Sequence, residues 1–198
     1  MFWRRYLPHF TPEGQPVFVT WRLAGSIPVP PAALLKNDPN PGKAFADFDR
    51  KLDTSQFGPR WLGDTRVASM FVSALKYGES TRRVYDLAAW VVMPNHVHIV
   101  IQPREPLPEI MRWLKIATAS RANRIIGISN GPFWQREYYD HWIRSEKELA
   151  SVVAYIERNP VSAGLVALPE KWPWSSANQA PVARPPAVQG FTGNRDEQ

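Results

Sequence analysis

Two histidines separated by a single residue, His96 and His98, are the first candidates for chemistry in this sequence. The apolar run from His96 to Gln102 predicts a β-strand. Alternate side chains of a strand point to the same face, so the two imidazoles lie together and Val97 faces the other way. Two imidazoles placed in this way can bind one cation, although a His-x-His pair also occurs by chance.

Tyr155 and Asn159 are four residues apart in a region that predicts a helix, so they lie one turn apart on the same face. Helical geometry places both beside the apolar stripe of that helix. The stripe consists of Leu149, Val152, Val153 and Ile156. A tyrosine in this position is commonly a packing residue whose hydroxyl contacts water.

Taken together, the histidines and the helix pair indicate a site for chemistry at a phosphate. A cation held by His96, His98 and the amide oxygen of Asn159 would bind the phosphate oxygens and orient the phosphorus for attack. Tyr155, one helical turn from that amide, would be the covalent nucleophile. Phosphate oxygens favour Mg²⁺ or Mn²⁺ over Zn²⁺, so one of these two ions is the expected cofactor.

The elements that must position these residues follow from hydrophobic periodicity and turn signals. Strands are predicted at Val17–Leu23, Val84–Met93, His96–Gln102 and Phe133–Arg144. Helices are predicted at Asp64–Tyr77, where Gly78 ends the helix, and at Leu107–Ile126. A third helix is predicted to begin at the capping box of Ser145 and Glu148. It ends at about Asn159, because Pro160 cannot continue a helix. This order predicts an α+β fold, a ferredoxin-like split βαβ sandwich, in which helices cover one face of an antiparallel sheet and one extra helix follows.

The length of 198 residues fits a single domain. We expect residues 1–176 to form it, with a long irregular loop at the prolines of residues 28–41 and with Trp172–Ser176 packed back on the domain. Residues 177–198 are Pro-rich and polar, which predicts a disordered tail.

The charge of the chain favours a polyanionic partner. The sequence has 24 Lys and Arg against 18 Asp and Glu, a net charge of +6, so nucleic acid is the first candidate. Its many aromatic residues could stack on unpaired bases, although most aromatics of a small domain are core. The polar face of the helix at 107–126 carries Arg112, Lys115 and Arg121, which form either a track for phosphates or an ordinary solvated face.

The chain has no cysteine, so disulfides and thiolate metal sites are excluded and a reducing cytoplasm would be tolerated. The N-terminal residues 1–10 lack the apolar core of a signal peptide, and no later run has the length of a membrane span. We therefore expect a cytoplasmic protein without a membrane partner.

Three segments carry a resemblance to a known family: Val92–Val100, which contains the His-Val-His motif, Tyr155–Val161, and Ala163–Val166. In this order they resemble the REP-associated tyrosine transposases, relatives of the single-tyrosine HUH transposases of insertion sequences. Trp134-Gln135, the Tyr139–His141 segment and Trp172–Ser176 are also similar to that family. The resemblance extends over roughly residues 16–176.

The resemblance implies a ferredoxin-like fold, a metal bound by His96, His98 and Asn159, and a Tyr155 that becomes linked to a DNA 5′-phosphate. Many insertion-sequence relatives have Gln where Asn159 stands, and Asn has the shorter reach. The family acts on single-stranded extragenic palindromes that fold into hairpins.

The family also reads the bases beside the hairpin with its N-terminal region, which implies DNA contacts for Arg4, Arg5 and Arg22. As surface arginines these three residues need no such role.

The expected function is that of a metal-dependent single-stranded DNA endonuclease and strand transferase, acting as a monomer or homodimer. One alternative is a non-catalytic single-stranded nucleic-acid-binding protein that retains the fold. Another is a metal-dependent hydrolase that activates water, in which Tyr155 only packs. Tyr138 and Tyr139 are less favoured nucleophiles, because strand aromatics mostly pack, and His141 is either a polar group near the site or a structural residue.

Overall fold

The structure is a computed structural model, and it describes residues 14–27, 47, 49–53, 58–128 and 131–179. The predicted loop at residues 28–41 lies outside the described residues, as do Arg4, Arg5 and most of the predicted tail. A short helix at Ser176–Asn178 crosses the expected end of the domain at residue 176, so the boundary and the disorder of the tail stay predictions.

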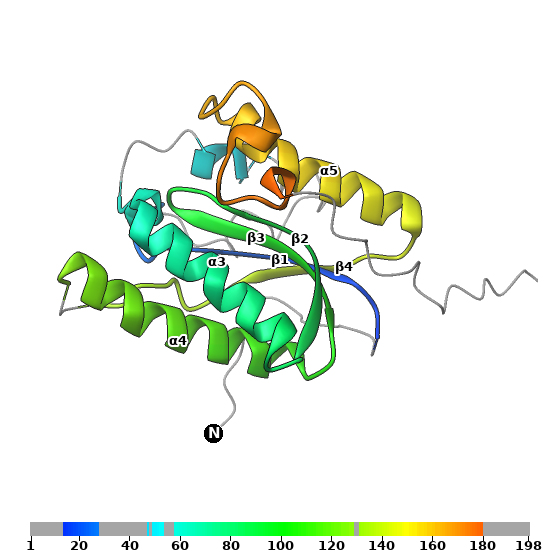
Figure 1. Cartoon of the computed structure of the whole chain (residues 1–198), viewed down its shortest axis with the longest axis horizontal. Coiled ribbons are helices and arrows are strands. Elements are labelled where there is room, and N and C mark those ends of the chain that lie inside the picture. Colours follow the sequence, from blue (N-terminus) through cyan, green and yellow to red (C-terminus); the bar gives the residue numbers. More distant parts are fainter. Residues whose placement is uncertain (1–13, 28–46, 48, 54–57, 129–130, 180–198) are drawn as a thin grey trace, which may run out of the picture.

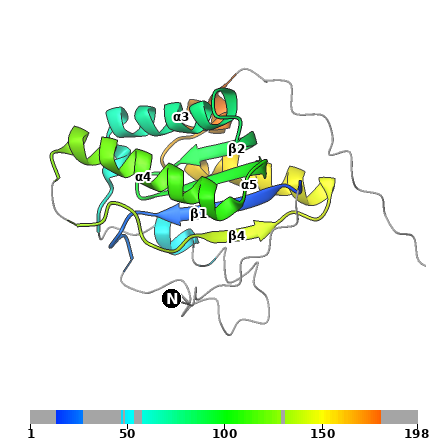
Figure 2. The same ribbon diagram turned by 90° about the horizontal axis from the view of Figure 1, so that it is seen from below.

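Four antiparallel strands form one sheet in the order β2-β3-β1-β4. They are β1 (Val17–Arg22), β2 (Tyr85–Val92), β3 (His96–Pro103) and β4 (Tyr139–Trp142). The helices α3 (Thr65–Ser80) and α4 (Leu107–Ile126) run side by side across one face, while α5 (Glu146–Ser162) lies on the other (Figures 1 and 2). This is the predicted α+β, ferredoxin-like arrangement with its extra helix.

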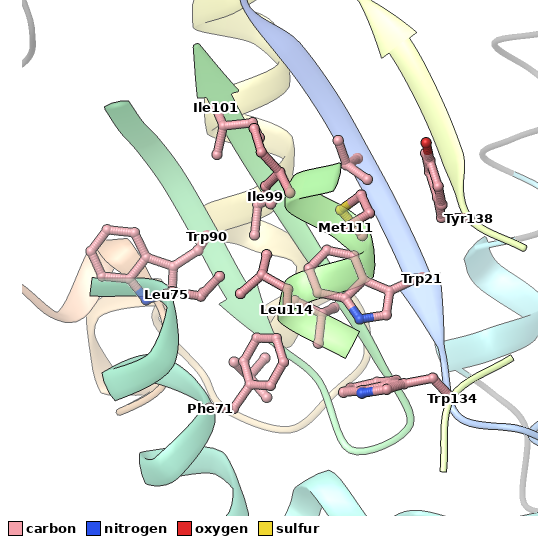
Figure 3. Close-up of a cluster of buried hydrophobic side chains, with 14 of the residues drawn as sticks. Trp21, Phe71, Leu75, Trp90, Ile99, Ile101, Met111, Leu114, Trp134 and Tyr138 are labelled. Atoms are coloured by element: carbon pink, nitrogen blue, oxygen red, sulfur yellow. The ribbon is translucent and has the colours of Figure 1, made fainter. Parts of the chain in front are cut away.

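The main core lies between the sheet and the helices α3 and α4. Three aromatic rings, Trp21 of β1, Phe71 of α3 and Trp134, pack on one another with centroids 5.6 to 6.0 Å apart (Figure 3). Val97, Ile99 and Ile101 of β3 belong to this core, as the predicted alternation of that strand requires. The other face of β3 is therefore left for the two histidines.

A second, smaller core lies between the sheet and α5. It contains Phe18, Val91 and Val100 from the strands and Val153 and Ile156 from α5. This cluster fixes α5 against the strand face that carries the histidines, because burial of apolar area orients an amphipathic helix.

The segment Trp172–Ser176 packs along the outer edge of β2, which confirms that it returns to the domain. The Val92 amide donates a hydrogen bond to the carbonyl oxygen of Trp174 (2.8 Å), and the Trp172 indole donates to the carbonyl oxygen of Val92 (3.0 Å). The Trp90 amide donates to the hydroxyl of Ser176 (3.2 Å). The segment thus satisfies backbone groups that an open sheet edge would expose.

Two predicted helix ends were wrong. The helix α3 continues through Gly78 to Ser80, because Gly78 makes room for the ring of Tyr85 rather than ending the helix. The helix α5 continues through Pro160 to Ser162. Proline removes only its own backbone donor, and the amides of Ala163 and Leu165 still donate to the carbonyl oxygens of Asn159 and Pro160.

The last strand is shorter than the predicted Phe133–Arg144, since only Tyr139–Trp142 pair with β1. Before it, Trp134 forms an isolated bridge with Leu23, and residues 135–137 turn their carbonyl oxygens toward the Lys115 ammonium. Among the described helices, none is long and apolar enough to cross a membrane.

Candidate metal centre and nucleophile

The two histidines of β3 meet on the face of the sheet that α5 covers. Both are fully buried, and their Nε2 atoms are 3.0 Å apart. Each ring is held at its other nitrogen: His98 Nδ1 by the hydroxyl of Thr20 on β1 (2.7 Å), and His96 Nδ1 by the amide oxygen of Asn95 (2.7 Å). Such bonds fix the ring orientation of a metal-binding histidine.

The hydrogen bonds around Asn95 also decide which nitrogen of His96 carries its proton. The Asn95 amide nitrogen donates to the carbonyl oxygen of Leu52 (2.8 Å), so the Asn95 oxygen must accept from His96 Nδ1. Burial, together with the neighbouring His98, lowers the pKa of His96 to about 3. The ring is therefore neutral near pH 7, and its Nε2 lone pair faces His98.

A carboxylate completes the group. Asp49, which is 1% exposed, lies on a helical segment formed by residues 49–53. Its Oδ1 is 3.2 Å from His98 Nε2 and 3.5 Å from His96 Nε2. Ligand atoms of these three residues all lie within 4.8 Å of one another, so they could hold one metal ion.

The second oxygen of Asp49 faces α5. Its Oδ2 accepts hydrogen bonds from the hydroxyl of Tyr155 and from the amide nitrogen of Asn159, the latter at 3.0 Å. Tyr155 is 36% exposed whereas Asn159 is 2% exposed, so of these two residues only the tyrosine keeps one side open to a substrate. Asp49 thus lies between the histidine pair and the tyrosine.

The ring of Phe18 supports this arrangement from β1. It stacks on His98 with centroids 5.6 Å apart and meets Tyr155 edge-on at 6.4 Å. The rings of His98 and Tyr155 are themselves 6.0 Å apart. The predicted nucleophile and the predicted metal ligands therefore share one site.

The ionisation of the site follows from burial and from the two carboxylates. Burial opposes the charge of Asp49, but His98, His96 and the Tyr155 hydroxyl outweigh it and keep its pKa below the usual range. Asp53, whose Oδ1 is 3.8 Å from His96 Nε2, has its pKa raised to about 8 by burial and by Asp49. Burial and the charge of Asp49 also raise the pKa of Tyr155.

The residues fit a divalent metal. The side-chain oxygens Asp49 Oδ1, Asp53 Oδ1 and Asn159 Oδ1 are buried without a hydrogen-bond donor in the described part of the chain. Buried acceptors without donors are costly, and a cation would satisfy several of them at once. A mixed set of imidazole nitrogens and carboxylate oxygens suits first-row divalent ions such as Mn²⁺.

The structure thus brings together His96, His98, Tyr155 and Asn159 and adds Asp49. The amide nitrogen of Asn159 faces Asp49, and a role for its oxygen as a metal ligand stays a prediction. Asp49 was missed because residues 49–53 form too short a segment to predict its orientation. The only signal was the spacing of Asp49 and Asp53, four apart and hence on one helical face.

The other candidate groups have different surroundings. Tyr138 lies in the main core, where the Lys115 ammonium is 5.4 Å from its ring centre. Tyr139 is in contact with Phe18, and burial raises its pKa to about 12. His141 Nε2 is 2.7 Å from the carboxylate of Glu148, at the start of α5.

The arginines and lysine predicted to contact DNA are scattered. Arg22 is 4% exposed and donates to Ser26 (3.1 Å). Arg112 is paired with Glu109 at 2.8 Å, and the Lys115 ammonium binds the carbonyl oxygens of residues 135–137. Arg121 is exposed on α4. Their contacts with DNA stay predictions.

Comparisons with known proteins find similarity to transposases. Residues 68–159, which include both histidines, Tyr155 and Asn159, match the family model described as transposase IS200 like. The chain is 33% identical over 95 residues to a REP-associated tyrosine transposase of Escherichia coli strain K12, covering 48% of this chain and 55% of that relative. It is 31% identical over 108 residues to a Haemophilus influenzae protein that carries the same family name, covering 46% of this chain and 58% of that relative. The chain thus spans just over half the length of the curated relatives it matches.

A solved structure supports the fold. This structure, of a REP-associated tyrosine transposase bound to a REP hairpin, aligns with a TM-score of 0.54 and 19% identity, over 100% of this chain and 99% of that chain. At this identity the likeness concerns the fold alone. The family model and the two relatives confirm the resemblance to REP-associated tyrosine transposases over the residues they match.

Proposed function

We propose that this protein is a metal-dependent single-stranded DNA endonuclease and strand transferase that links DNA to Tyr155. The observation that carries the proposal is the convergence of the Tyr155 hydroxyl, the two Nε2 atoms and the Asp49 carboxylate in one group. The family of residues 68–159 supports it. The similar structure bound to a REP hairpin supports a hairpin-forming single-stranded palindrome as the substrate.

The chemistry assigned to the chain is a transesterification. The Tyr155 oxygen attacks a phosphorus of the DNA strand, a bond from that oxygen to phosphorus forms, and the bond from phosphorus to the 3′-oxygen breaks. The 3′-oxygen takes a proton from solvent and leaves as a hydroxyl, while the Tyr155 proton passes to Asp49 Oδ2, which accepts its hydrogen bond, and from there to solvent. The products are a 5′-phosphotyrosine and a free 3′-hydroxyl.

His96, His98 and Asp49 would hold the metal, and the amide oxygen of Asn159 would complete the set. When bound, Mg²⁺ or Mn²⁺ would offset the negative charge of the phosphate and orient it for attack. His96 and His98 are pre-oriented for this by Asn95 and Thr20. The neutral His96 ring supplies a lone pair of the kind that metal binding requires.

The phosphotyrosine retains the energy of the broken phosphodiester. A free 3′-hydroxyl can therefore reverse the attack and join strands, and the reaction needs no nucleotide cofactor. Action in the cytoplasm, and as a monomer or homodimer, stays a prediction.

The test is a denaturing gel of the protein mixed with labelled single-stranded hairpins and Mn²⁺. We expect a covalent protein–DNA band that disappears with chelator, with Tyr155→Phe and with His96→Ala. Tyr139→Phe is the matched control and should retain the band, because Tyr139 lies on β4 and not on α5.

Other outcomes would identify the alternatives. Tight binding without a covalent band across many hairpins would favour a non-catalytic binding protein. Cleavage that persists in Tyr155→Phe without an adduct would favour a hydrolase that activates water.

A further inference from the structure

We propose that Asp49 is a bridging carboxylate, one oxygen binding the metal beside the two histidines and the other positioning the Tyr155 hydroxyl. This inference rests on the proposed function and deepens it. The family match begins at residue 68, so Asp49 lies outside the region that defines the family here.

Asp49 Oδ1 is the oxygen assigned to the metal. This atom is buried, has no hydrogen-bond donor among the described residues, and lies 3.2 and 3.5 Å from the two Nε2 atoms. His96 Nε2 carries a lone pair, because its proton is on Nδ1. His96 Nε2 and Asp49 Oδ1 are then both acceptors and cannot bond to each other. A cation between them would remove their repulsion and offset the desolvation cost of the buried carboxylate.

Asp49 Oδ2 is the oxygen assigned to positioning the Tyr155 hydroxyl. It accepts hydrogen bonds from Tyr155 and Asn159, both on α5 and one turn apart. These bonds hold the carboxylate plane and leave Oδ1 directed at the histidines. The carboxylate that contacts the metal therefore also sets the position of the nucleophilic oxygen.

The segment that carries Asp49 is tied to the histidines a second time. The carbonyl oxygen of Leu52, a fully buried residue, accepts from the Asn95 amide, and Asn95 in turn holds His96 Nδ1. Residues 49–53 thus contact the site through a backbone oxygen and a side chain. This second contact gives the segment a fixed place against β3.

The metal-binding half is tested by titrating Mn²⁺ into the full chain without DNA and measuring heat. Asp49→Asn keeps the shape of the side chain and removes its charge, and we expect it to weaken Mn²⁺ binding at least about tenfold. Asp47→Asn is the matched control, since Asp47 is two residues before Asp49 in the sequence but is 48% exposed and paired with Arg50. Equal affinity of wild type and Asp49→Asn overturns this half.

The positioning half is tested by single-turnover adduct formation at Mn²⁺ concentrations that saturate both proteins. We expect Asp49→Asn to stay at least about tenfold slower than wild type, because an amide that turns its oxygen to the metal turns its nitrogen, a donor, to the Tyr155 hydroxyl. A rate that returns to that of wild type at saturating Mn²⁺ overturns the positioning role.

A crystal structure of the wild-type protein with Mn²⁺ gives an answer that does not depend on the folding of any variant. We expect an anomalous peak about 2.1 Å from Asp49 Oδ1 and from both Nε2 atoms. A peak held by the histidines with Asp49 turned away overturns the proposal.

The two proposals fail differently. If wild type binds Mn²⁺ and forms the adduct while Asp49→Asn behaves identically, only the role of Asp49 is wrong. If wild type binds Mn²⁺ but forms no adduct with any hairpin, the proposed function is wrong whatever Asp49 binds.

Discussion

At the residue scale, the site depends on hydrogen bonds that orient each imidazole. Thr20 and Asn95 hold the two Nδ1 atoms at 2.7 Å, so both Nε2 atoms converge. Neither partner is a proposed metal ligand, yet each fixes a ring that is.

Replacing Thr20 with Val keeps the side-chain shape and removes the hydroxyl that holds His98. We expect Mn²⁺ affinity, measured by calorimetry, to fall about 10- to 100-fold, the usual effect of losing a group that orients a ligand. The control is Thr118→Val, a buried threonine whose hydroxyl accepts from Trp134 in the main core. An unchanged affinity in Thr20→Val would show that His98 needs no support from β1.

The sequence was sufficient to predict that His96 and His98 share a strand face and that Tyr155 and Asn159 share a helix face, because each pair lies within one regular element. A period of two in a strand and of 3.6 in a helix determines which side chains share a face. Asp49 has no such pattern, because its place depends on a tertiary contact between a short segment and β3. The direction of the Asn159 amide likewise depends on Asp49, a residue 110 positions away.

At the element scale, the predicted strands and helices were correct where apolar periodicity is long, as in α4, whose predicted and observed bounds coincide. Two of the errors lie where a side chain from elsewhere in the chain contacts the segment. Lys115 of α4 donates to the carbonyl oxygens of residues 135–137, which belong to the predicted last strand but lie outside β4. The sequence predicts a helix end at Gly78, whereas in the structure this residue lies within α3 and packs closely on Tyr85.

Gly78→Ala tests that role. A Cβ at residue 78 would lie 2.6 and 2.9 Å from ring carbons of Tyr85, a residue fixed by its hydrogen bond to the carbonyl oxygen of Leu75 (2.7 Å). We expect urea denaturation to show a loss of about 1–3 kcal/mol in the free energy of unfolding.

The control for this variant is Gly63→Ala, where a Cβ would meet only Pro94 at 3.8 Å. Its free energy of unfolding should change much less. A stability gain in Gly78→Ala, as expected for an open helix position, would mean that the ring of Tyr85 moves aside freely.

At the scale of the whole molecule, the position of the site and the net charge bear on the proposed DNA partner. The sheet carries the site on its α5 face, and Trp172–Ser176 satisfies the outer edge of β2. The net charge of +6 attracts a polyanion from any direction. The net charge follows from composition, but composition does not show which basic side chains form hydrogen bonds or ion pairs within the fold.

Basic residues that are free to contact DNA can be distinguished from those engaged within the fold by comparing Arg121 with Lys115. Both residues lie on α4. For Arg121→Ala we expect weaker binding of a single-stranded hairpin at low salt, and a log-affinity against log-salt slope shallower by about 0.7–1. For Lys115→Ala we expect mainly a lower free energy of unfolding, because three carbonyl oxygens lose their donor.

Fluorescence anisotropy over a range of salt concentrations measures the slopes, and urea denaturation measures the stabilities. An unchanged slope for Arg121→Ala would remove Arg121 from the DNA-binding surface. The same slope change for both variants would mean that Lys115 also reaches the phosphates.

Under the proposed function, Tyr155 becomes covalently bound to DNA. The most direct measurement is mass spectrometry of the protein after reaction with a single-stranded hairpin and Mn²⁺, followed by nuclease and protease digestion. We predict that the peptide containing Tyr155 carries a nucleotide attached through its 5′-phosphate. A nucleotide on another residue, or cleaved DNA with no modified peptide, would contradict the account.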